Sequence, residues 1–373
     1  MQITSPNNRI TLQVLEFGLT VHSLQINLSN GETIDVIPAP DVEDHKKSKF
    51  LHTIIGRYTN RLPVGNHQID SSTSFTPQLV EGDSVSLHGG VDAFDKKLFA
   101  PIKLEQAQLY AENDRLPNHS MALFNYVSSS GENGYPGTML VEAAFFLSDH
   151  SLILTHRAKM LDEVACPINL TQHWGFNLTA DQVKSSTIAD HDLYLNARSI
   201  AETDPATKLA TGKSVAIQGT PFDFSTQRKI GDREIVQDHY YLFDRNARGI
   251  DRTIAHSLQD VKPATEIAQT HQPQLTLESG DVALRFHTNQ SGVMFYAGGK
   301  FDKSAAHRKP CHVDDKDRDA AYPRHGSAFF EFHHPLATFL HDEYAAHANT
   351  STILNKDEGN VYQNWAKIDV VVK

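Results

Sequence analysis

The chain has 373 residues, 39% of them hydrophobic and 9% aromatic, which is enough apolar material for a large buried core and too much for a disordered chain. Its formal net charge of -11 at pH 7 argues against nucleic acid or an anionic membrane as a partner, because both would repel it at long range. A neutral small molecule is the expected ligand.

The cysteines and the N-terminus bear on where the protein works. Cys166 and Cys311 are too few for a disulfide framework, and neither belongs to a CxxC pair that would suggest zinc. The first ten residues are polar and lack the apolar centre of a secretory signal, and no apolar run is long enough to cross a bilayer. We therefore expect a cytoplasmic protein. No Gly/Ser-rich or Pro-rich linker divides the chain, so we expect a single domain spanning residues 1–373.

The first third of the chain predicts short strands. Ile10, Leu12 and Val14 alternate with polar residues until Gly18, and GETIDVIPAP reads as a turn followed by a strand. A charged loop, Asp41 to Lys49, comes next.

Two motifs follow this loop. In FLHTIIGRYTNRLPVGNHQI, Arg57 and Arg61 flank Asn60, and the neutral interpretation is a solvated turn. In SLHGG, His88 precedes two glycines whose backbone could approach a ligand closely, although a glycine turn after a strand explains the motif equally well.

The middle third is the most regular part. Residues 138–147 and 151–160 predict consecutive antiparallel strands with a short turn between them. The segment Asn169 to Leu178, NLTQHWGFNL, has the alternation of a half-buried strand and carries His173 beside an aromatic ring. An imidazole on a rigid strand is a plausible acid or base near neutral pH, but a histidine beside tryptophan is more often a packing residue.

The last third continues with strands in DHYYLFD, DVALRFHTNQSGVMFYAGG, SAFFEFHHP and WAKIDVVVK. Helical periodicity is confined to Leu336–Tyr344 and a turn near Asp232–Val236, and the charged stretch Lys303–Arg324 is expected to be a surface loop. Short strands with turn signals and few helices predict an all-β protein built as a large antiparallel β-sandwich.

Several of these stretches together resemble the aldose 1-epimerase family, also called galactose mutarotases. In chain order they are GRYTNRL, SLHGG with FDK shortly after it, GENGYPG, PINLTQHWGFNL, GTPFDF, DHYYLFD and SAFFEF. The resemblance extends from Ile3 to the C-terminus. It implies a galactose mutarotase-like supersandwich that binds a hexose and uses no metal or other cofactor. We expect a monomer or homodimer.

The same resemblance implies roles for individual residues. On the family's pattern His173 is the general acid and Glu331 the general base. The residues that would contact the sugar or lie beside the acid are Asn60, Arg61, His88, Trp174, Gly175, Asp238 and Met294.

The chemistry asks for such a pair. Opening a cyclic hemiacetal requires one group to take the proton of the anomeric hydroxyl while another protonates the ring oxygen. We expect Glu331 to be ionised and His173 protonated, each favouring the charged form of the other. Without the resemblance, alternation alone would place Glu331 on the solvent face with Phe330 and Phe332 inward, and Asp238 would read as a turn residue.

Departures from the family pattern leave the substrate open. Gly175 stands where the family usually has a tyrosine, Met294 replaces a usual glutamine, and Phe330 to His333 replace the common Leu-Glu-Thr-Gln. The acid and base pair could therefore act on a larger glycoside, a sugar phosphate or a non-sugar hemiacetal. A phosphate-specific site should show an arginine cluster, and only Arg57 and Arg61 lie close to a motif.

Two further classes stay open. A non-catalytic sugar-binding or regulatory protein is one, although a pure binder would not need both His173 and Glu331. A metal-dependent hydrolase is the other; it is disfavoured because His333 and His334 are adjacent and would point to opposite faces of a strand.

Overall fold

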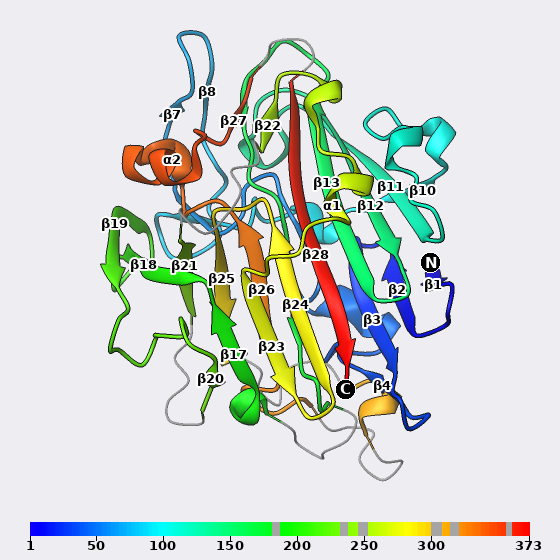
Figure 1. Ribbon diagram of the computed structural model, residues 1–373. Helices are drawn as coiled ribbons and strands as arrows, with labels where there is room; N and C mark the ends of the chain where they lie inside the picture. The colour runs from blue at the N-terminus through cyan, green and yellow to red at the C-terminus, as the bar shows by residue number, and fades with distance from the viewer. Residues whose placement is uncertain (181–186, 232–237, 245–252, 300–307, 314–320, 356–359) are drawn as a thin grey trace.

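The computed structural model describes residues 1–180, 187–231, 238–244, 253–299, 308–313, 321–355 and 360–373. Antiparallel strands are the predominant secondary structure of this described part, and its helices are few and short (Figure 1). The predicted all-β fold class is therefore confirmed. None of the described helices is long and apolar enough to span a membrane.

The largest sheet has ten strands and is centred on the C-terminal strand, drawn red in Figure 1. Its strands, in spatial order, are β10 (Ala100–Ile102), β11 (Ser120–Ser128), β12 (Met139–Leu147), β13 (Ser151–Met160), β28 (Val361–Val372), β24 (Val282–Thr288), β23 (Leu275–Ser279), β17 (Asp192–Leu195) and β20 (Arg228–Lys229), with β22 (Ile254–Ala255) paired to β28. The hairpin predicted at residues 138–160 is confirmed as β12 and β13, which pair Met139 with Met160.

A second sheet has six strands and carries the predicted acid and base. In order they are β16 (Trp174–Phe176), β26 (Ala328–His333), β25 (Gly292–Tyr296), β21 (Asp238–Phe243), β18 (Ala197–Thr203) and β19 (Ala210–Ala216). The N-terminal segment forms a four-stranded sheet of β1 (Gln2–Thr4), β2 (Ile10–Leu15), β3 (Thr20–Asn27) and β4 (Thr33–Asp35).

Alternation along β26 decides which side chains enter the core. Phe330 and Phe332 point toward the ten-stranded sheet, where each ring centroid lies 5.6 Å from that of Phe286 on β24. Burying a phenylalanine ring in this way stabilises the fold by about 1.5–3 kcal/mol. Because successive residues of a strand face opposite sides, Glu331 points away from this core.

Four further sheets of the described part have two short strands each. They are β5 (Ile54–Ile55) with β15 (Thr171–Gln172), β6 (Arg61–Pro63) with β9 (Val85–Leu87), β7 (His67–Gln68) with β8 (Ser74–Phe75), and β14 (Cys166–Pro167) with β27 (Ile353–Leu354).

The helices of the described part are short. The α-helices are α1 (Ala264–Ile267) and α2 (Asp342–Ala348). The 3-10 turns are η1 (Val42–Lys47), η2 (Phe94–Lys96), η3 (Leu104–Gln106), η4 (Glu112–Asp114), η5 (Glu132–Gly134), η6 (Ile188–Asp190), η8 (Leu258–Asp260), η9 (Pro310–His312) and η10 (Thr338–Leu340). The helix expected at Leu336–Tyr344 is thus partly right, since α2 begins at Asp342. The turn expected at 232–236 lies outside the described residues.

The expectation of a surface loop at 303–324 is only partly right for its described parts, 308–313 and 321–324, because Pro310, Cys311 and Arg324 are exposed while three polar side chains are not. Lys309, His312 and Tyr322 are buried. The Lys309 ammonium lies 2.6 Å from Oδ2 of Asp35, and the Tyr322 hydroxyl donates to the carbonyl of Ala39. Composition indicated a surface because these side chains are polar, but they are buried together with their partners. Residues 303–307 and 314–320 lie outside the described part.

Candidate active site

The predicted acid and base lie side by side. His173 directly precedes β16, Glu331 is on the adjacent strand β26, and Nε2 of His173 is 3.2 Å from Oε1 of Glu331. The Glu331 side chain is 3% exposed and that of His173 is 12% exposed, so the pair can be reached from the His173 side. The Glu331 Oε2 atom is buried and has no hydrogen-bond partner among the described residues.

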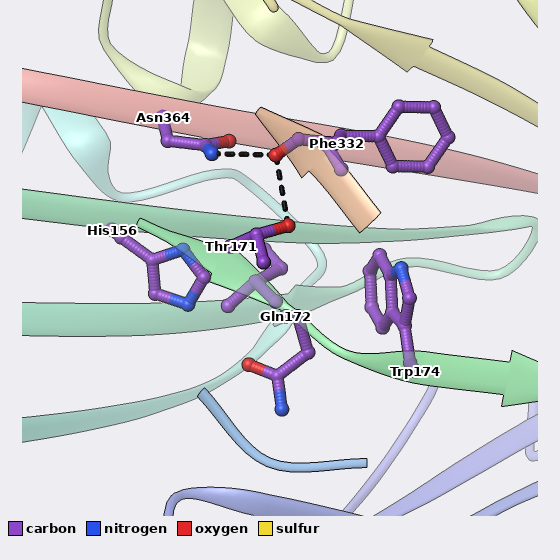
Figure 2. A pocket seen from close by; sticks show the side chains of 8 residues that line it. His156, Thr171, Gln172, Trp174, Phe332 and Asn364 are labelled. Atoms are coloured by element: carbon purple, nitrogen blue, oxygen red, sulfur yellow. Dashed lines mark hydrogen bonds between the residues drawn. The ribbon is translucent and has the colours of Figure 1, made fainter. Parts of the chain in front are cut away.

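The backbone around His173 is fixed from both sides. Its N–H donates to the carbonyl of Thr53, and its carbonyl accepts from the N–H of His52. On the other strand, the carbonyl of Phe332 accepts hydrogen bonds from Thr171 Oγ1 and Asn364 Nδ2, both at 2.9 Å (Figure 2). These bonds join β15, β26 and β28 and set the spacing between His173 and Glu331.

Trp174, predicted to lie beside the sugar, points the other way. Its side chain is buried between the sheets and lines a cavity of about 10 Å³ together with His156 and Gln172 (Figure 2). A cavity of this size holds roughly one water molecule and no sugar. Strand alternation is the reason, since it places His173 and Gly175 on one face and Trp174 on the other.

The strand pairing in the six-stranded sheet shows where Met294 and Asp238 lie relative to Glu331. Met294 on β25 is the direct neighbour of Glu331 and is itself paired with Tyr240 on β21. One row further along, Asp238 pairs with Tyr296, which pairs with Phe329. All these side chains share the face of Glu331. Met294 is buried, Tyr296 half-buried and Asp238 exposed, so the face opens to solvent at the Asp238 end.

Gly175 leaves room for Phe329, which lies directly opposite it on β26. A Cβ atom at Gly175 would lie 2.6 Å from the Phe329 ring and 2.4 Å from Ser327 Oγ. The Phe329 ring in turn packs against the His173 ring, with 5.2 Å between centroids. The space beside the acid, which Gly175 alone would leave open, is therefore occupied by an aromatic ring from the neighbouring strand.

Asn60, Arg61 and His88 come together at the paired strands β6 and β9. The N–H of His88 donates to the Asn60 carbonyl, and the N–H of Asn60 lies 3.3 Å from Nδ1 of His88. The His88 ring is 5.5 Å from that of His173. Since Nδ1 accepts, Nε2 carries the proton of the neutral imidazole and is a hydrogen-bond donor. Arg61 is half-buried and donates from Nε to Glu81.

The two glycines after His88 have a packing role. Gly89 has a φ of +93°, and a Cβ there would lie 2.0 Å from the carbonyl oxygen of Gly56. A Cβ at Gly90 would meet the side chain of Asn133. Of the two interpretations of SLHGG, the structure supports the turn with close backbone packing.

Burial reverses the expected protonation pattern of the pair. Desolvation lowers the pKa of His173 to about 4 and raises the pKa of Glu331 to about 8, with the charge of Asp238 raising it further and Arg61 lowering it. The expectation of a raised histidine and a lowered glutamate pKa is therefore wrong. Removal of both groups from water outweighs their mutual attraction. Between these values the pair carries one proton, which the short Nε2 to Oε1 contact lets the two groups share.

Two groups of side chains have metal-binding types and spacing. The potential ligand atoms of His88, His173 and Glu331 lie within 4.8 Å of one another, as do those of Asp35, Cys311 and His312. In the first group, Nδ1 of His88 accepts the N–H of Asn60, so its Nε2 carries a proton and offers no lone pair to a metal. In the second, the ammonium of Lys309 already neutralises Asp35. Neither donor set fits a resident cation.

Sequence reasoning missed two histidines near the pair. His333, two residues after Glu331 and on the same face, is fully buried; its Nδ1 donates to the carbonyl of His334, and its Nε2 has no hydrogen-bond partner among the described residues. His52 accepts the N–H of Gly175 through Nδ1. The spacing of His333 from Glu331 was a usable signal, whereas His52 reaches the site only through the tertiary fold.

Comparisons with known proteins identify the family of this chain. The family model described as Aldose 1-epimerase matches residues 1–325, a range that includes His173 but ends before Glu331. The chain is 28% identical over 324 residues to a galactose mutarotase of Homo sapiens, covering 86% of this chain and 82% of the human protein. It is 28% identical over 302 residues to an aldose 1-epimerase of Escherichia coli (strain K12), covering 79% and 78%.

Solved structures share the fold. A GalM/aldose epimerase homologue from C. elegans has a TM-score of 0.75 at 18% identity. The match covers 100% of this chain and 98% of the C. elegans chain. A galactose 1-epimerase from Lactobacillus acidophilus NCFM has a TM-score of 0.66 at 19% identity and covers 98% and 92%. The expected galactose mutarotase-like sandwich is thereby confirmed. With a family model that matches most of its length, the chain belongs to the aldose 1-epimerase family, a family of isomerases.

Proposed function

We propose that this protein interconverts the α and β anomers of a hexose such as galactose or glucose, with His173 as general acid and Glu331 as general base. The observation that supports this most is the 3.2 Å contact between the two side chains on one partly open face. A protein that only binds sugar has no need for a buried imidazole and carboxyl that share one proton.

The reaction follows from that single proton. The pKa values place the shared proton mainly on Glu331, and its transfer across the 3.2 Å contact to Nε2 of His173 gives the charge-separated form, in which Glu331 is a carboxylate and His173 an imidazolium. Glu331 takes the proton of the anomeric hydroxyl while His173 gives its proton to the ring oxygen, and the bond between C1 and the ring oxygen breaks to give the open-chain aldehyde. Rotation about C1–C2 presents the other carbonyl face, and closure with reversed roles restores the pair. Each positioned transfer contributes about 10² to 10⁴ in rate.

Binding a neutral polyol requires groups with defined donor and acceptor roles. In our proposal the Nε2–H of His88 donates to a sugar hydroxyl, Asp238 accepts at the exposed end, and Arg61 and Asn60 complete the contact. Gly175 contributes by leaving room for Phe329. Trp174 has no direct part, because its ring faces the core.

Met294 supports a second candidate, a hemiacetal less polar than a simple hexose. Its thioether is buried beside Glu331 and packs in one apolar cluster with Tyr240 and Leu336. A sugar phosphate is less well supported. Arg57 is buried, and its guanidinium donates hydrogen bonds to Ser128 and to the carbonyls of Pro136 and Gly137. Among the described residues, Arg61 is therefore the arginine that acts on the pair of Glu331 and His173.

We further propose that residues 1–373 form one domain. A single cluster of buried apolar side chains runs from Ile10 in the first sheet to Val370 in the last strand.

Polarimetry tests the proposed activity. The protein is expected to accelerate the approach to equilibrium rotation of freshly dissolved α-galactose or α-glucose. If folded protein accelerates neither, the hexose assignment is wrong, and a panel of other hemiacetals should follow. Met294→Gln discriminates between the candidates. It should lower KM for simple hexoses if the missing amide limits recognition, and an unchanged or raised KM favours the less polar substrate.

A further inference from the structure

His52 connects to both sides of the proposed acid. Its backbone N–H donates to the carbonyl of His173 at 3.0 Å, and its side-chain Nδ1 accepts the N–H of Gly175 at 3.0 Å. The other ring nitrogen, Nε2, lies 2.7 Å from the carbonyl of Pro38. Because Nδ1 must accept and Nε2 must donate, the ring is held as one neutral tautomer.

The His52 ring also supports the ring that packs on the acid. It stacks on Phe329 with 5.6 Å between centroids and 28° between planes, and Phe329 packs against the His173 ring at 5.2 Å. The three rings therefore form a continuous series from His52 to His173. A change at His52 reaches His173 by two routes, through the strand and through Phe329.

The backbone of His52 adopts an uncommon conformation that its contacts hold in place. The residue is fully buried with a φ of +61°, in the left-handed region that non-glycine residues seldom adopt. Its carbonyl accepts from Gln172 Nε2 and from the N–H of Val21. Residues held in such a conformation by their surroundings concentrate at functional sites.

We propose that His52 is a positioning residue for catalysis, which fixes the orientation and the desolvation of the His173 imidazole through Gly175 and Phe329. This inference rests on the proposed function. His52 does not touch the substrate. It keeps the acid nitrogen of His173 opposite Glu331 and keeps the Phe329 ring pressed against the imidazole.

The groups that face His173 define its titration. Glu331 is at 3.2 Å and His88 has its ring at 5.5 Å. His333 and His52 are close enough for a charge on His173 to lower the pKa of each. All three neighbouring histidines have pKa values lowered by burial and are neutral near pH 7. A change in the pKa of His173 in a His52 variant therefore reports its solvation and its distance from Glu331.

Three side-chain replacements separate the contacts. His52→Phe keeps a ring on Phe329 and removes both hydrogen bonds. His52→Asn places an oxygen near the Nδ1 position and can still accept from Gly175. His52→Gln places an amide nitrogen near the Nε2 position and can still donate to Pro38.

The three His52 variants are expected to differ in kcat. His52→Phe and His52→Gln should lower kcat about 10- to 100-fold with KM within about twofold, because small misplacement of a catalytic group is costly. His52→Asn should retain more kcat than His52→Gln, because it still accepts from Gly175, but less than the wild type, because it lacks the ring that stacks on Phe329. The NMR-measured pKa of the His173 imidazole should rise in His52→Phe and His52→Gln, as water gains access to it, and rise less in His52→Asn.

His191 supplies the matched control. It is also buried and also accepts a strand N–H, that of Leu178, at 2.9 Å. His191→Phe should lower the stability and leave kcat and the pKa of His173 unchanged.

The outcomes separate cleanly. Equal loss of activity in all three His52 variants, in proportion to lost folded protein, would overturn the positioning role, as would a His52→Phe protein with wild-type kcat and an unchanged His173 pKa. If the wild type itself shows no mutarotation, the proposed function fails, while the NMR titration still decides whether His52 controls the His173 imidazole.

Discussion

His173 and Glu331 meet through a 3.2 Å contact between Nε2 and Oε1, and burial moves their pKa values in opposite directions. The glutamate holds a proton to about pH 8 and the histidine gains one only near pH 4. Over the range between these values the pair carries one proton in total. Such a pair can give a proton at one atom and take one at another without exchange with solvent.

The pH dependence of turnover follows from the number of protons that His173 and Glu331 carry together. Above about pH 8 the pair loses its proton and with it the acid; below about pH 4 it gains a second and loses the base. We expect kcat to form a plateau between these limits and to fall on both sides. Asp238 raises and Arg61 lowers the upper limit. Asp238→Asn should move that limit to lower pH, and a limit that stays in place would show that the Asp238 charge does not act on Glu331.

Stability should depend on pH through the same glutamate. The folded protein keeps the Glu331 proton up to about pH 8 and the unfolded chain loses it near 4.5. The folded state therefore binds more protons in this window, and its stability falls as pH rises, by at most about 1.4 kcal/mol per pH unit. The lowered pKa of His173 has the opposite effect, because it makes the stability rise with pH between pH 4 and pH 6.5. The net loss of stability from the two groups is therefore expected between pH 6.5 and about pH 8.

Glu331→Gln isolates this contribution. Its stability relative to the wild type should rise from pH 4.5 to about pH 8, measured by denaturant unfolding, and level off above that. Glu163→Gln, an exposed change, serves as the control. A constant difference between Glu331→Gln and the wild type across this window would show that Glu331 is not held protonated.

Gly175 and Phe329 should be coupled. Gly175→Ala introduces a Cβ 2.6 Å from the Phe329 ring, and we expect it to lower the free energy of unfolding by about 1–3 kcal/mol. In a Phe329→Leu background the smaller side chain can move aside, so the added cost of Gly175→Ala should shrink by at least about 0.5 kcal/mol. Strict additivity of the two changes would contradict the packing described between them.

The buried ion pair between Lys309 and Asp35 should hold residues 308–313 against the N-terminal sheet. Lys309→Met leaves the Asp35 carboxylate buried without its counter-charge and should cost about 3–5 kcal/mol. The double change Lys309→Met with Asp35→Asn removes both charges and should cost less. Denaturant unfolding at pH 7 measures both, and a Lys309→Met protein of wild-type stability would mean that the pair does not contribute.

The sequence predicted which residues meet but not how they are solvated. Motif order identified His173 and Glu331, and alternation in SAFFEFHHP correctly placed Phe330 and Phe332 in the core. Alternation alone suggested a solvent-facing Glu331, because it reports the side of a strand and not what covers that side. The reversed pKa values have the same origin, since desolvation is set by segments distant in the chain.

Two other differences have physical causes. The resemblance to the family places Trp174 beside the acid and the sugar, yet neighbours on a strand face opposite sides, and its ring lies in the core. The charges of 303–324 predict a surface loop, but Lys309 is buried because Asp35, far away in sequence, neutralises it. His52 carried no local signal at all, because its contacts to Gly175 and Pro38 exist only in the folded chain.

In the proposed reaction His173 and Glu331 work as one proton-exchanging unit across an anomeric centre. The most direct measurement is kcat for mutarotation of α-galactose by the wild type, His173→Asn, Glu331→Gln and the double variant, each shown to be folded. We predict that either single change lowers kcat by about 10² to 10⁴ and that the double change lowers it little further. A single variant that retains wild-type turnover, or two losses that multiply in the double variant, would contradict the account.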